Sequence, residues 1–143
     1  MAEPERVRIR IRGTQKDAEG AVQHTETQAV ARHDGKGGKH YLRYEDRTLL
    51  AGQAVPSLLK FSENGLTLVR HGAVEQRLEF VRGAERQGLY RSPYGNIPLT
   101  VRTHELSLAC QADGTGRIAL RYDLFLQGAF QGSCALTIEI EAE

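Results

Sequence analysis

The sequence predicts an all-β fold, a single and mainly antiparallel barrel of eight to ten strands. Apolar and polar residues alternate with a period of two through most of the 143 residues, and no segment holds a helical period over three turns. Short turns rich in glycine, proline and asparagine separate the alternating runs. About nine strands in a meander would leave exposed edges in an open sheet, so closure into a barrel is favoured.

In the first half of the chain, the alternation is clearest at residues 7–12, where apolar residues alternate with arginines. A more polar strand is expected at residues 22–32, followed by a hairpin tip at Gly35-Lys36-Gly37-Gly38. Further strands are predicted at residues 39–46, 58–62 and 66–70. The last two are joined by Glu63-Asn64-Gly65, which is a hairpin signal.

In the second half, a strand is expected at residues 74–80, then a reversal bracketed by Gly83 and Gly88 and a turn at residues 93–96. Between residues 97 and 110 the apolar side chains change from odd to even positions. This change of parity predicts a β-bulge near residues 103–105 in one continuous strand. After a turn at residues 113–116, two strands are expected at residues 117–126 and 130–140.

Both cysteines, Cys110 and Cys134, are predicted to face inward on either side of the strand 117–126. Their facing residues would be Ile118 and Tyr122, respectively. Neighbouring strands lie about 4.8 Å apart, so thiols two strands apart exceed the roughly 7 Å between Cα atoms that a disulfide spans. Free buried thiols in a reducing cytoplasm are therefore expected.

The length fits one domain, with a short tail at residues 1–6 and a barrel at residues 7–143. Nineteen Lys and Arg against eighteen Asp and Glu give a net charge of +1, which argues against a dedicated polyanion binder but allows a local patch. No apolar segment resembles a secretory signal or reaches the ~20 residues of a membrane span. A cytoplasmic protein is expected.

Several segments, taken in order, resemble the YwiB-like family of uncharacterised bacterial proteins. The resemblance covers residues 7 to 140 and departs at Ser92, where a threonine is expected before the Pro-Tyr-Gly turn. It implies a calycin-like, lipocalin-related barrel and a bacterial cytoplasmic protein, and it brings no activity or catalytic residue. The segments are residues 42–45, 70–74, 77–80, 90–95, 102–103, 116–118 and 122–124.

Polar residues in these segments, among them Glu45 and Arg102, fall at predicted strand ends and turns. At one mouth of a small barrel such residues can orient an amphipathic ligand, with Arg77, Arg70 and Tyr44 at its polar or anionic end. The competing interpretation is a structural network in which an arginine closes the barrel end against Glu45. The candidate ligand-binding residues are Tyr44, Arg70, Arg77, Tyr90, Tyr94 and Tyr122.

The histidines suggest no metal site, because none forms a close ligand pair. His24, His33 and His71 are expected at solvated strand ends or turns, whereas His40 shares the parity of inward residues. No nucleophile, phosphate-loop or dinucleotide motif is present, so no cofactor is expected.

Three functions remain open at this point. The leading one is non-catalytic binding of a small apolar or amphipathic ligand inside the barrel. The alternative is a solid barrel that acts as a structural or protein-interaction module through an exposed strand edge or a homodimer. A third is an enzyme that uses His40 with Glu45 or Tyr44. The arginine row at residues 6, 8, 10 and 12 lacks interleaved aromatic residues, so nucleic acid is not an expected partner, and the short apolar runs give no reason to expect a membrane.

Overall fold

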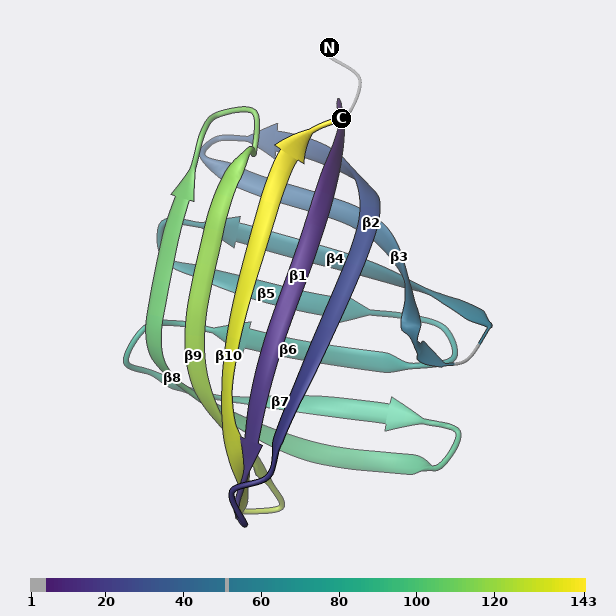
Figure 1. The fold of residues 1–143 in the computed structure, drawn as a ribbon, viewed down its shortest axis with the longest axis vertical. Helices are drawn as coiled ribbons and strands as arrows, with labels where there is room; N and C mark the ends of the chain where they lie inside the picture. The colour runs from purple at the N-terminus through teal and green to yellow at the C-terminus, as the bar shows by residue number, and fades with distance from the viewer. Residues whose placement is uncertain (1–4, 51) are drawn as a thin grey trace.

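A computed structural model describes residues 5–50 and 52–143 as a closed antiparallel barrel. Each strand pairs with its neighbours in the chain, and β1 also pairs with β10, which closes the sheet (Figure 1). The predicted all-β barrel is confirmed, with ten strands in the described residues. The strands are β1 Glu5–Asp17, β2 Val22–Lys36, β3 Lys39–Leu50, β4 Gln53–Ser62, β5 Gly65–Arg70, β6 Glu75–Phe80, β7 Glu85–Ser92, β8 Gly95–Cys110, β9 Gly116–Leu126 and β10 Ala129–Ala142.

The start of the barrel lies slightly earlier than the predicted boundary at residue 7. β1 begins at Glu5, and residues 1–4 of the predicted tail lie outside the described residues. Within residues 5–50 and 52–143, no helix has the length and apolar character needed to cross a bilayer.

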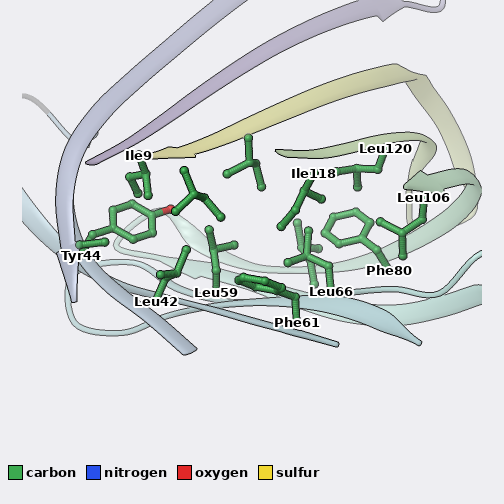
Figure 2. Close-up of a cluster of buried hydrophobic side chains, with 14 of the residues drawn as sticks. Ile9, Leu42, Tyr44, Leu59, Phe61, Leu66, Phe80, Leu106, Ile118 and Leu120 are labelled. Atoms are coloured by element: carbon green, nitrogen blue, oxygen red, sulfur yellow. The ribbon is translucent and has the colours of Figure 1, made fainter. Parts of the chain in front are cut away.

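The period-two pattern sorts side chains between the barrel interior and the outer surface. On β1, Val7 and Ile9 are 2% exposed, and Arg8 between them faces outward. Inward residues from most of the strands form one apolar cluster, which includes Leu42, Phe80 and Ile118 (Figure 2). Burial of apolar surface at about 25 cal/mol per Å² makes this cluster the main source of stability.

The predicted β-bulge in the long strand β8 is confirmed. The register of β8 against β9 shifts between Thr103 and Glu105, so His104 is the extra residue. Val101 and Leu106 are both buried although their positions differ in parity. The bulge therefore turns the second half of β8 so that its even positions face the interior.

Two predicted details of the turns are wrong. Gly88 lies inside β7 rather than at a reversal, and a Cβ there would collide with the carbonyl oxygen of Arg77 on β6. Its role is close backbone approach, not a turn. Cys110 lies opposite Gly116 instead of Ile118, because the loop 111–115 is centred on Asp113.

The prediction for Cys134 and the prediction of free thiols are confirmed. Cys134 lies opposite Tyr122, and both cysteines are free thiols. Cys134 is buried and Cys110 is partly buried against the core.

The barrel has two short seams, where neighbouring strands pair over only part of their length. β2 and β3 pair through five residue pairs, from Arg32–Arg43 to Lys36–Lys39 around the turn at Gly37 and Gly38. β6 and β7 pair through three, Glu75–Arg91 to Arg77–Leu89. Residues 22–31 of β2 pair with β1 and have no ladder partner on the β3 side within the described chain. The ladder between β2 and β3 is therefore open beyond Arg32 and Arg43, where the two strands diverge on the right of Figure 1.

Candidate functional site

A cavity of about 520 Å³ lies in the barrel interior next to the open β2–β3 seam. Its apolar wall comes mainly from β4, β5, β6 and β10, and its polar residues come from β2, β3, β5, β6 and β9. The apolar wall includes Leu59, Leu66, Leu68, Leu78, Phe80 and Ile138. The polar residues include Thr27, Tyr44, Asp46, Arg70, Gln76 and Tyr122. This volume lies within the roughly 300–1,000 Å³ of small-molecule sites.

A buried ion pair forms the polar side of the cavity. Arg70 Nη2 lies 3.1 Å from Asp46 Oδ2, and the two side chains are 12% and 3% exposed. Arg70 also donates to Gln76 Oε1 at 2.6 Å, because the turn between β5 and β6 sets these residues opposite each other. Asp46 Oδ1 accepts hydrogen bonds from the backbone N–H and hydroxyl of Thr48. The pair brings no net charge into the cavity.

Two hydrogen-bond donors in this region have no partner among the described residues. They are the hydroxyl of Tyr44 and Nε of Arg70, and both atoms are buried. Figure 2 shows the Tyr44 hydroxyl directed toward the barrel interior. Burial raises the pKa of Tyr44, and the nearby Arg70 opposes that shift. Tyr44 therefore keeps its proton at neutral pH and offers an O–H to a hydrogen-bond acceptor.

Tyr122 and Cys134 add no reactive group to the cavity region. Burial raises the pKa of Tyr122 far above its usual value, and burial also raises the pKa of Cys134. The Tyr122 ring packs against Phe80, with ring centroids 4.8 Å apart. Burial raises the pKa of Cys110 as well, so both thiols stay protonated and are poor nucleophiles.

A histidine pair lies at the other end of β3, where β2 and β3 are paired. His33 Nε2 and His40 Nδ1 are 2.9 Å apart and share a hydrogen bond, and the His40 ring stacks on Phe61. His33 is only 6% exposed, so the prediction that it is solvated is wrong. Burial lowers the pKa of His33, with a further contribution from His40, while Asp113 opposes the shift. No group of three or more His, Cys, Asp or Glu in residues 5–50 and 52–143 is arranged to hold a metal ion.

The structure brings together only part of the predicted ligand-binding set. Tyr44, Arg70 and Tyr122 line the cavity, and Tyr90 packs against the core outside its lining. Arg77 faces outward near Glu79, because its odd position on β6 has the outer parity.

Tyr94 is 94% exposed in the turn between β7 and β8. Neither Arg77 nor Tyr94 can reach a ligand in the cavity, so both are removed from the candidate site.

Asp46 is the candidate site residue that the sequence reasoning missed. The competing structural interpretation placed Glu45 against an arginine at the barrel end, but Glu45 faces outward and binds Arg47 at 3.1 Å. Position 46 has the parity of the inward residues Leu42 and Tyr44, and that parity was the available signal. The outward direction of Glu45 also places it on the opposite face of β3 from Tyr44, the other residue that the enzyme hypothesis combined with His40.

Comparisons with known proteins give the same fold without an activity. A family model described as a domain of unknown function (DUF1934) matches residues 9–138. The chain is 30% identical over 89 residues to the uncharacterized beta-barrel protein YwiB of Bacillus subtilis (strain 168). That match covers 62% of this chain and 61% of the relative, less than two thirds of its length. The crystal structure of the ywiB protein from Bacillus subtilis matches with a TM-score of 0.80 at 23% identity, over 97% of this chain and 94% of that chain.

Proposed function

This chain belongs to the DUF1934 family of domains of unknown function, and we propose that it binds a small apolar or amphipathic ligand, without catalysis, inside its barrel. One observation carries the proposal, namely a cavity of about 520 Å³ with an apolar wall, whose lining residues Tyr44 and Arg70 each carry a buried donor without a partner among the described residues. A solid barrel would bury its polar atoms with partners, because each unpartnered donor costs about 1–3 kcal/mol.

The polar atoms of the cavity define the ligand's chemistry. Arg70 Nε can only donate a hydrogen bond, and the protonated Tyr44 hydroxyl can donate its O–H. Since Asp46 already balances the charge of Arg70, the matching group is a hydrogen-bond acceptor such as a carbonyl or carboxyl oxygen. The rest of the ligand is apolar and packs against the leucines of β4, β5 and β6.

Native mass spectrometry of gently purified protein is the direct test, followed by denaturation and identification of what is released. A reproducible non-covalent adduct is expected. In parallel, the fluorescent polyene fatty acid cis-parinaric acid is titrated into protein stripped of bound lipid. Its apolar chain and carboxyl oxygen match the cavity, so saturable fluorescence enhancement is expected.

Paired tryptophan variants distinguish the cavity from the surface. Leu68→Trp fills the cavity, whereas Leu89→Trp places the same side chain on the outer face, where Leu89 is 37% exposed. Binding of cis-parinaric acid should fall at least tenfold in the first variant and stay unchanged in the second. Circular dichroism verifies that both variants fold, and Tyr44→Phe tests the donor without a large change in volume. Equal binding by all variants, or no saturable binding by the native chain, contradicts the proposal.

The alternative function keeps one supporting observation. Residues 22–31 of β2 form an edge without a ladder partner toward β3, and such an edge is suited to pairing with a second copy of the chain. Light scattering across a concentration series tests for that homodimer.

We also propose a cytoplasmic location for the protein, since free thiols fit a reducing compartment.

A further inference from the structure

A groove of about 730 Å³ runs along the outer surface between β2 and β3 and adjoins the interior cavity at Thr27, Tyr44 and Thr48. Four arginines, Arg6, Arg32, Arg43 and Arg47, line it together with a single carboxylate residue, Glu45. The barrel as a whole is nearly neutral, with a net charge of +1. Positive charge is therefore concentrated at this groove.

Elsewhere on the barrel, outward arginines lie beside acids. Arg10 and Arg12 both lie within 3.4 Å of Glu26. Arg8 lies opposite Glu141 in the β1–β10 register. This pattern explains most of the arginine row on β1 as a solvated, charge-balanced face.

The groove departs from this pattern. Arg32 lies directly opposite Arg6 on β1 and directly opposite Arg43 on β3. Arg6 and Arg47 have carboxylate partners, whereas Arg32 and Arg43 have none within 4 Å in the described part of the chain. Like charges directly opposite each other on neighbouring strands destabilise a sheet.

Only one other cross-strand pair of like charges occurs in residues 5–50 and 52–143. It joins Lys36 and Lys39, the two ends of the same β2–β3 hairpin. All the cross-strand pairs of like charge in the described residues therefore involve β2, and the two arginine pairs, Arg6 with Arg32 and Arg32 with Arg43, lie at the groove. An anionic ligand would relieve the repulsion that this arrangement creates.

The geometry points to a binding site for a phosphate group in the outer groove, held by Arg32 and Arg43 and flanked by Arg6 and Arg47. Residues directly opposite in a ladder have Cβ atoms roughly 5 Å apart, so two guanidinium groups can approach different oxygens of one tetrahedral dianion. A carboxylate carries one charge, which a single guanidinium fork satisfies. Two unbalanced arginines side by side therefore fit a doubly charged phosphate better.

The groove also offers main-chain donors beside the arginines. Gln28, Ala29 and Val30 line it, and they belong to the part of β2 that has no ladder partner on the β3 side among the described residues. Backbone N–H groups on this edge are free to bind phosphate oxygens. The groove shares Thr27, Tyr44 and Thr48 with the interior cavity, but its four arginines do not line that cavity, so variants of Arg32 and Arg43 test the groove without changing the cavity lining.

Thermal unfolding with added inorganic pyrophosphate tests the site, with sodium chloride at equal ionic strength as the reference. Saturable stabilisation by pyrophosphate beyond the chloride effect is expected for the native chain. Arg32→Gln/Arg43→Gln should weaken the apparent affinity at least tenfold. Arg91→Gln/Arg121→Gln is the matched control, because it removes the same charge from exposed arginines elsewhere and should bind like the native chain.

Co-sedimentation with phosphatidylcholine vesicles containing phosphatidic acid distinguishes the source of the phosphate. Binding to vesicles that the groove variant loses assigns a lipid headgroup, and binding to pyrophosphate alone assigns a soluble phosphate ligand. Either result supports the site. The inference is overturned if neither probe binds saturably, or if the groove variant and the control variant bind equally.

Discussion

Asp46→Asn isolates the charge of the ion pair inside the barrel. Asparagine has nearly the same shape and keeps an oxygen that accepts from Thr48, so the main loss is the carboxylate charge beside Arg70. Because the Arg70 side chain is only 12% exposed, its guanidinium would remain buried without a counter-charge. Removing one partner of a buried pair costs about 3–5 kcal/mol.

That loss is a large part of the stability of a domain, which is typically about 5–15 kcal/mol. With a urea m-value of about 2 kcal/mol per molar, the unfolding midpoint should fall by roughly 1.5–2.5 M. Urea unfolding followed by circular dichroism measures this shift.

An exposed ion pair in the same barrel provides the control. Arg121 and Glu105 lie 3.4 Å apart with side chains more than 60% exposed. Glu105→Gln should therefore cost less than about 1 kcal/mol. A loss below about 1 kcal/mol for Asp46→Asn as well would refute the reasoning that burial gives the interior pair its importance. The double variant Asp46→Asn/Arg70→Met removes both charges and should recover much of the loss.

Three further predictions concern pH, backbone packing and the cavity hydroxyl. Folding lowers the pKa of His33 below the ordinary value of 6.5, so the unfolded chain takes up a proton on this residue at a higher pH than the folded chain does. The stabilising effect of the neutral His33 is therefore fully present above pH 6.5 and is lost as the pH falls through the folded-state pKa. His33→Gln should make the melting temperature change less between pH 7 and pH 5. His24→Gln, at an exposed position, is the control and should keep the pH dependence of the native chain's melting temperature. Gly88→Ala should cost at least about 1–3 kcal/mol in urea because its Cβ meets backbone on β6, whereas Gly83→Ala, in open space, should cost only about 1 kcal/mol. Tyr44→Phe removes an unpartnered buried hydroxyl and should therefore raise the stability of the ligand-free protein by up to about 1–3 kcal/mol. Calorimetry measures this change, and a loss of stability would show that the hydroxyl has a hydrogen-bond partner.

The faces of the strands could be predicted because parity is a local property of the sequence. The change from odd to even apolar positions in β8 located the bulge at His104 correctly. The same rule, applied to β3, would have selected Asp46 over Glu45 as the interior acid. On β6 it would have placed Arg77 on the outside. These errors came from weighing residue type ahead of parity.

Other features depend on contacts between distant segments, and no local pattern records them. His33 is buried because β2 continues to Lys36 and the loop 111–115 packs beside it, with Gly114 against its ring. The arginine groove needs the register of β2 against both β1 and β3. The length of each hydrogen-bonded seam, which opens the cavity, likewise follows only from the assembled barrel.

The two short seams divide the ten strands into two panels. One panel comprises β3 to β6, and the other comprises β7 to β10 together with β1 and β2. The ladders that join the panels are the five pairs of β2 with β3 and the three pairs of β6 with β7, and core side chains such as Phe80 and Tyr122 pack across from one panel to the other. A change in the angle between the panels would strain these pairs and leave the ladders inside each panel intact. Such a change would alter the width of the interior, while the hydrogen bonds within each panel would persist.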